Sequence, residues 1–152
     1  MKGGLIWADN NWKGFGRQYD YTSLYPYILT KYFFPIGKGE FKTVQSIYYD
    51  NRGKRFIYYG IYRAKVEYKE EMVKLFRYNN QNFYTYHDLT RATDLGLTVN
   101  IIQDGQFNAL IYDSKKTYPG TVMFGGYVEM LFNIKLEGGP AGTAAKKILN
   151  IL

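Results

Sequence analysis

The chain has 152 residues, enough for one domain with a hydrophobic core or for a large part of one. It contains no cysteine, which excludes disulfides and thiolate metal sites, and its single histidine cannot build a histidine-based zinc site. No apolar stretch approaches the ~20 residues of a membrane span. Since Met1–Gly4 also lacks the apolar region of a signal peptide, we expect an intracellular protein without a membrane partner.

The composition combines positive charge with many aromatic side chains. The formal net charge is +7, and 17 tyrosines contribute to an aromatic share of 19%. Cations follow the phosphates of a nucleic acid while aromatic rings stack on its bases, so this combination favours a polyanionic partner. A mildly basic domain, or one that binds other proteins through tyrosines, has the same composition.

The N-terminal third predicts two strands and a short helix. Gly3-Gly4 indicates a turn into a strand at 5–7, and a polar loop at 9–14 leads into a second strand at 15–21 that carries Asp20. Ser23 is a typical N-cap, and a proline in the first helical turn is tolerated because its missing N–H would be unpaired there. We therefore expect a helix to begin after Ser23, with Pro26 in its first turn.

The middle of the chain reads as a series of short strands. A breaker cluster at 33–39 precedes a strand at 40–46, a basic turn at 50–54 and one long strand at 56–68. Shorter strands are expected at 75–76 and 82–86, followed by a helix at 89–95 that Asp88 or Thr90 caps and Gly96 ends. We expect 97–103 and 107–112 to pair as a hairpin across Asp104-Gly105, and His87 to be a structural or surface residue.

The last third predicts two helices. Apolar residues recur at helical spacing over 123–136 and again over 141–152, with a break at Gly138–Pro140. Lys146 and Asn150, four residues apart, share the polar side of the second helix. The expected fold is α+β, with a mixed, mostly antiparallel sheet and a C-terminal antiparallel helix pair.

The turn at residues 20–23 has chemical possibilities of its own. A carboxylate at the end of a strand can hold a metal ion, and the backbone N–H groups that open a helix can hold phosphate. An ordinary turn or helix cap needs the same residues, so the pattern alone leaves both interpretations open.

Two motifs resemble those of family B DNA polymerases. The run Asp20-x-x-Ser23-Leu24-Tyr25-Pro26-x-Ile28 is similar to motif A, although Tyr27 stands where the family usually has serine. The final helix resembles the start of motif B, a lysine followed four residues later by asparagine. Lys146 and Asn150 hold these two places, while Ile151 departs from the serine that follows in the family.

The resemblance implies a role for each matching residue. Asp20 would be catalytic and would hold two Mg²⁺ (or Mn²⁺) ions with the backbone carbonyl of Tyr21, and the Tyr25 ring would exclude a 2′-hydroxyl. Lys146 would be catalytic through the phosphates of the incoming nucleotide, as a cation can neutralise charge on a transferring phosphoryl group. The nucleotide-binding residues would be Ser23, Leu24, Tyr25, Lys135, Lys146 and Asn150.

The resemblance also implies an incomplete polymerase. Residues 1–118 would be a partial palm with an inserted strand-rich region, and 119–152 a fingers-like helix pair. The long interval between the motifs resembles the protein-primed or organellar and viral branch. A second carboxylate motif, Asp-Thr-Asp, follows motif B in the family and does not occur in these 152 residues. We therefore expect this segment to be inactive alone and to need the other polymerase domains, DNA template and primer, and deoxynucleotides.

Two further interpretations stay open. The first is a non-catalytic, polymerase-derived module that binds nucleotide or nucleic acid. The second is a globular α+β domain whose match to the motifs is accidental.

Overall fold

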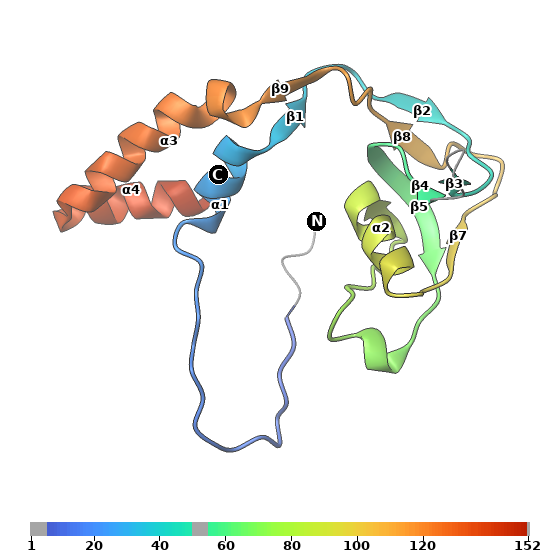
Figure 1. The fold of residues 1–152 in the computed structure, drawn as a ribbon, viewed down its shortest axis with the longest axis horizontal. Helices are drawn as coiled ribbons and strands as arrows, with labels where there is room; N and C mark the ends of the chain where they lie inside the picture. The colour runs from blue at the N-terminus through green and yellow to red at the C-terminus, as the bar shows by residue number, and fades with distance from the viewer. Residues whose placement is uncertain (1–5, 50–54, 152) are drawn as a thin grey trace. The chain divides into compact units, whose positions relative to one another are not determined.

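The computed structural model describes residues 6–49 and 55–151. Its described part contains four α-helices and nine short strands, and every strand pairing is antiparallel (Figure 1). The expected α+β class is thereby confirmed. The chain forms two compact units, which we call the sheet unit (Met1–Lys13 and Gly37–Ser114) and the helical unit (Gly14–Ile36 and Lys115–Leu152). The boundary expected at residue 118 between palm and fingers segments stays a prediction.

The sheet unit is built around strand β5 (Gly60–Val66). On one edge β5 pairs with β6 (Phe83–Thr85), and β8 (Ala109–Ile111) joins it to β2 (Glu40–Lys42). Buried and more exposed residues alternate along β5, with Tyr62, Ala64 and Val66 in the core. This period of two is what a strand shows when one face of its sheet is covered.

Helix α2 (Tyr86–Asp94) contributes Leu89 and Ala92 to the same core. The predicted cap is wrong, because the N-cap is Thr85 instead of Asp88 or Thr90. The Thr85 hydroxyl accepts from the Asp88 N–H, and the Asp88 carboxylate accepts from the Thr85 N–H. The helix starts earlier than expected because this reciprocal capping box needs an acidic residue three positions after the cap. Gly96, with φ 71°, follows the helix end as predicted.

The predicted hairpin across Asp104-Gly105 is wrong. Strand β7 (Val99–Ile101) and strand β8 do not pair with each other; both pair with β5, at Ala64–Val66 and at Gly60–Tyr62 respectively. They therefore form one interrupted strand beside β5, and residues 102–108 loop out between its two parts. The Arg63 guanidinium holds this loop through two hydrogen bonds to the Asp104 carboxylate.

Other strands also differ from the prediction. The expected long strand at 56–68 is divided, because β4 (Arg55–Phe56) pairs with β3 (Tyr48–Tyr49) and β5 begins only at Gly60. Gly60 begins β5 at a position where a side chain would overlap the carbonyl of Leu110 in the neighbouring strand. The expected strand at 75–76 is absent, with a 3₁₀ turn (Glu70–Met72) just before it. The basic turn predicted at 50–54 lies outside the described residues.

The strand predicted to carry Asp20 does not form. Residues 15–21 are irregular and exposed, as are residues 6 and 7, the described part of the strand expected at 5–7. A strand exists only when its backbone groups pair with a neighbour, and none of the described strands pairs with this segment. The local sequence at 15–21 is therefore not sufficient for strand formation.

The helical unit contains helices α1 (Leu24–Lys31), α3 (Gly120–Glu137) and α4 (Gly139–Ile151). Within the cluster expected to break the chain, β1 (Phe33–Pro35) pairs with β9 (Thr117–Pro119) and links α1 to α3. The two C-terminal helices are confirmed, and α4 turns back beside α3 at Gly138 (Figure 1). Their shared core consists of Val128, Leu131, Ala145 and Leu149, so only part of each predicted apolar stripe is buried.

Candidate functional site

A pocket of about 500 Å³ lies in the helical unit, between the start of α1 and the facing parts of α3 and α4. Its lining combines one carboxylate, two lysines, two aliphatic hydroxyl side chains, two tyrosines, two leucines and an amide. The described residues that line it are Asp20, Tyr21, Thr22, Ser23, Leu24, Tyr25, Lys135, Lys146, Leu149 and Asn150.

Every residue that the two motifs singled out for the site lines this one pocket. Residues 20–23 come from the turn before α1, and Leu24 and Tyr25 from its first turn. Lys135 comes from the end of α3, and Lys146 and Asn150 come from α4. More than a hundred residues separate the two groups along the chain. Thr22 and Leu149 also line the pocket but were not predicted as site residues. The signal for Thr22 was its place in the turn, and that for Leu149 was its place in the apolar stripe of α4.

Lys135 binds directly to the turn before α1. Its Nζ donates to Ser23 Oγ at 2.8 Å and also lies 4.9 Å from the centre of the Phe132 ring. Ser23 occupies the N-cap position as predicted, but its side chain makes no capping hydrogen bond. Its backbone is left-handed, with φ 56° and ψ 44°, where N-caps are normally extended.

The start of α1 therefore presents an open helix end to the pocket. The first N–H groups of a helix have no carbonyl within the helix to pair with. In α1 the first of them are those of Leu24 and Tyr25, since Pro26 has no N–H and the N–H of Tyr27 already bonds to the Ser23 carbonyl. Such a helix end attracts an anion.

Helix α4 supplies the second basic side of the pocket. Lys146 and Asn150 are exposed and lie one turn apart, and Leu149 beside them is buried in the core of the helical unit. Packing of Leu149 and Ala145 against α3 fixes which face of α4 is turned inward. Lys146 is therefore held near the pocket by the helix to which it belongs.

The lining does not by itself provide a complete metal site. Asp20 is its single carboxylate, and no group of three or more His, Asp or Glu side chains is placed to hold a metal among the described residues. Magnesium bound through one carboxylate usually takes its remaining ligands from waters and substrate phosphates. One carboxylate among the described lining residues is fewer than a site for two magnesium ions needs.

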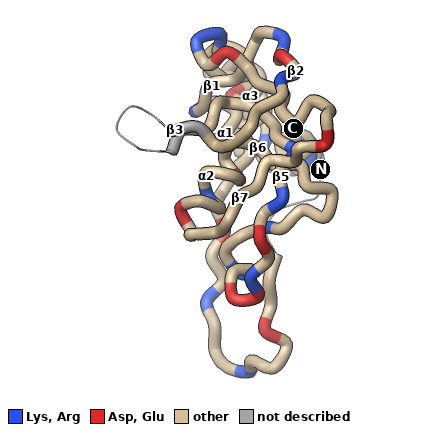
Figure 2. Tube along the Cα trace, turned by 90° about the vertical axis from the view of Figure 1, so that its right-hand side faces the viewer, with Lys and Arg blue, Asp and Glu red and all other residues tan. Residues whose placement is uncertain are grey.

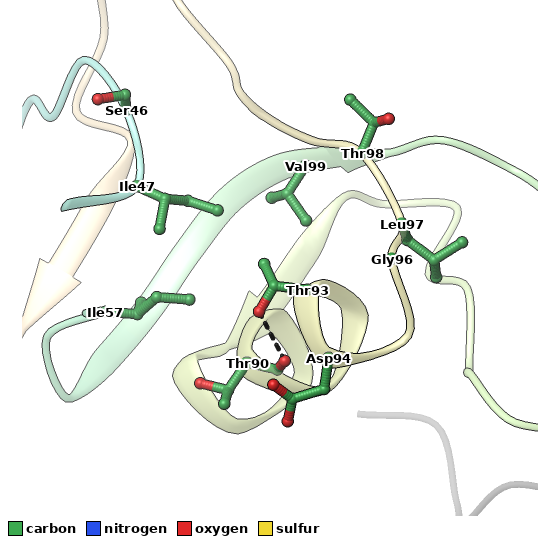
Figure 3. Close-up of a pocket in the computed structure, with 10 residues that line it drawn as sticks. All are labelled: Ser46, Ile47, Ile57, Thr90, Thr93, Asp94, Gly96, Leu97, Thr98 and Val99. Carbon is green, nitrogen blue, oxygen red and sulfur yellow. Dashed lines mark hydrogen bonds between the residues drawn. The ribbon is translucent and has the colours of Figure 1, made fainter. Parts of the chain in front are cut away.

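A second pocket, of about 570 Å³, lies in the sheet unit. Figure 3 shows the aliphatic side chains of Ile47, Ile57 and Val99 around it, with Thr90 and Thr93 on α2 opposite. Asp94 is the single ionisable side chain among its described lining residues, so this pocket lacks the positive charge that an anionic ligand needs. The sequence contained no motif that pointed to it.

Two tyrosines and one carboxylate with shifted pKa values lie in the sheet unit. Burial raises the pKa of Tyr84 and of Tyr86 above the ordinary tyrosine value. The hydrogen bonds from Arg63 lower the pKa of Asp104. These groups stabilise strands and the 102–108 loop, and we assign them no role at the pocket of the helical unit. His87 is exposed next to Tyr86.

Positive charge is spread along the molecule. Lysine and arginine positions are interspersed with acidic ones over the whole tube in Figure 2. None of the described helices is both long and apolar enough to cross a membrane.

No family model, no curated protein and no solved structure matches the chain.

Proposed function

We propose that the pocket of the helical unit binds the triphosphate of a deoxynucleotide with one divalent metal ion. In this proposal the chain is a segment of a family B DNA polymerase, and the pocket is half of its nucleotide site. The observation that carries the proposal is the meeting of the two motifs: Asp20–Tyr25 and Lys146 with Asn150 line one pocket although they lie far apart in the sequence.

The charges of the pocket suit a triphosphate. Lys135 and Lys146 outnumber Asp20, and the open end of α1 adds the partial positive charge of a helix N-terminus. Lysine binds phosphate as a compact point charge, and backbone N–H groups bind it with defined direction. Lys146 would contact the phosphates, and Asp20 would hold the metal ion that accompanies them.

An apolar hollow beside the pocket suits the rest of a nucleotide. It measures about 340 Å³, is lined by Ile28, Leu29 and Ile151, and shares Tyr25 and Asn150 with the charged pocket. A ligand with a polyanionic end and a flat, partly apolar end would use both spaces. Tyr25 offers an aromatic face for the sugar or base, and the Asn150 amide offers hydrogen bonds to polar edges.

The single carboxylate favours a second candidate, a module that binds nucleotide or nucleic acid without transferring a nucleotide. Nucleotidyl transfer by two metal ions needs ligands for both of them, whereas binding alone does not. The gene distinguishes the two candidates. An Asp-Thr-Asp motif encoded downstream of Asn150 would support the polymerase, and a stop codon directly after residue 152 would support the binding module.

The test is titration calorimetry with dATP, with and without Mn²⁺, on the wild-type chain, Lys146→Ala and Asp20→Asn. We expect Lys146→Ala to weaken binding about tenfold in both conditions, the scale of one charge-assisted hydrogen bond. Asp20→Asn should weaken binding only when Mn²⁺ is present. Without metal it removes a negative charge beside the triphosphate and should leave affinity unchanged or slightly raised.

Lys147→Ala is the matched control, since Lys147 is the exposed neighbour of Lys146 and is absent from the described lining of the pocket. Equal losses for Lys146→Ala and Lys147→Ala would reduce the effect to net charge and contradict a specific site. No binding of dATP by the wild type under either condition would overturn the proposal.

A further inference from the structure

The contact between Lys135 and Ser23 joins two unusual features of the helical unit. Ser23 is one of two described non-glycine residues with positive φ. Left-handed backbone is unfavourable for a residue with a side chain, so it persists only where neighbouring contacts hold it. The charge-assisted hydrogen bond from Lys135 Nζ to Ser23 Oγ is such a contact.

The same bond changes what the Ser23 hydroxyl can do. A serine at an N-cap ordinarily accepts from the N–H of the second or third helical residue and so occupies the helix end. In α1 the third residue is Pro26, which has no N–H, and the Ser23 side chain makes no capping bond. With its hydroxyl bound to Lys135, the serine leaves the N–H groups of Leu24 and Tyr25 for another acceptor.

Helix α3 holds α1 at both ends. At the C-terminal end of α1, the Gly120 N–H donates to the Tyr32 carbonyl at 2.8 Å and the Thr121 hydroxyl donates to the Thr30 carbonyl at 2.6 Å. At the N-terminal end, Lys135 of the same α3 helix binds Ser23. The position of the open helix end therefore depends on the bond that Lys135 of α3 makes to the Ser23 side chain.

We propose that Lys135 is a positioning residue, which keeps Ser23 left-handed and its hydroxyl off the helix end so that phosphate can bind the N–H groups of Leu24 and Tyr25. This inference rests on the proposed function. It gives Lys135 a role distinct from the direct phosphate contact that the resemblance implies. Lys146 then remains the lysine that binds the phosphates themselves.

A double-mutant cycle between residues 135 and 23 separates the two roles. Glycine adopts left-handed backbone without cost and has no hydroxyl that could cap the helix, so Lys135 has nothing to hold in the Ser23→Gly background. The probe is inorganic tripolyphosphate, measured by calorimetry, which isolates phosphate binding from contacts to sugar and base. Lys135→Met should weaken its binding about fivefold with Ser23 present and less than twofold in the Ser23→Gly background.

A direct contact from Lys135 to phosphate predicts a different result. Lys135→Met would then cause the same fold-loss in both backgrounds, and that outcome would overturn the inference. Lys147→Met controls for the loss of one positive charge. Circular dichroism melting curves check that each variant folds. If Lys135→Met does not fold, Lys135→Gln replaces it.

Backbone amide spectra give an independent readout. Tripolyphosphate should shift the ¹⁵N–¹H signals of Leu24 and Tyr25 in the wild type, and these shifts should disappear in Lys135→Met and return in Lys135→Met with Ser23→Gly. Unshifted amides in a wild-type chain that does bind tripolyphosphate would overturn the inference alone. A wild type that binds neither tripolyphosphate nor dATP would overturn the proposed function together with it.

Discussion

The two units of the molecule bury their apolar residues very differently. Among the described residues, the sheet unit has ten buried hydrophobic residues in one cluster, drawn from strands, α2 and the segments between them. The helical unit has four, all between α3 and α4, while α1 leaves large side chains such as Tyr25, Tyr27 and Ile28 exposed. The larger cluster should contribute more to the free energy of unfolding of the sheet unit, because apolar burial is the dominant favourable term in folding.

The difference extends to polar groups. In the sheet unit the buried Asn108 side chain satisfies the Val44 N–H and the carbonyls of Val44 and Ile102. In the helical unit the side chains of Lys146 and Asn150 at the pocket are exposed, and the end of α1 lacks a side-chain cap. A unit with satisfied polar groups is suited to structure, and one with exposed donors and charges is suited to binding.

The largest expected effect is on the core of the sheet unit. Leu89 is fully buried at the centre of α2, and Leu89→Ala should lower the free energy of unfolding by about 3 kcal/mol through lost burial and a residual cavity. The exposed neighbour gives the control Thr90→Ala. Urea unfolding followed by circular dichroism measures both, and similar losses for the two variants would contradict this account of the core.

A second change tests the buried polar network. Asn108→Ala removes a side chain that is 1% exposed and leaves the Val44 N–H without its acceptor. We expect a loss of about 2 kcal/mol, because a buried donor without a partner retains its full desolvation cost. Asn100→Ala, at an exposed position of β7, is the matched control. Hydrogen exchange should show faster exchange at Val44 in Asn108→Ala only.

The corresponding change in the helical unit should cost somewhat less. Leu131 is 5% exposed, and its cluster has few members, so neighbouring side chains can close part of the cavity in Leu131→Ala. We expect a loss of about 1.5 to 2 kcal/mol, at the low end for buried leucine. Met130→Ala, on the exposed side of α3, is the control. A loss larger than that of Leu89→Ala would reverse the comparison between the units.

The smallest expected effect is a pH dependence in the sheet unit. Arg63 lowers the pKa of Asp104 in the folded state, so the ion pair stabilises the fold above the unfolded-state pKa and this contribution is lost as the pH falls through the folded-state pKa. Below about pH 4, the free energy of unfolding of Asp104→Asn should therefore fall less steeply with decreasing pH than that of the wild type. Asp94→Asn, another exposed carboxylate of the unit, is the control, and identical acid-unfolding curves for all three proteins would contradict the assignment.

Local signals were sufficient to predict some elements. Apolar residues at helical spacing and the Gly138–Pro140 break predicted α3 and α4 closely, and Gly96 correctly marked the end of α2. The site residues were also named in advance, because two short motifs have fixed spacing. Their assembly into one pocket follows from helix geometry once α1, α3 and α4 pack together, whereas their roles stay a proposal.

The sequence by itself determined which segments form the C-terminal helices, where glycines end helices and which side chains carry charge, because glycine breaks, apolar spacing and side-chain chemistry act over a few residues. Only the tertiary structure decided which strands pair. Residues 97–103 and 107–112 suited a hairpin, yet β5 offered both of them a longer common edge, and residues 15–21 found no partner among the described strands. Strand pairing depends on residues that are distant in the chain and leaves no local signal. The same holds for the left-handed turn at Ser23, whose side chain is bound by the distant Lys135.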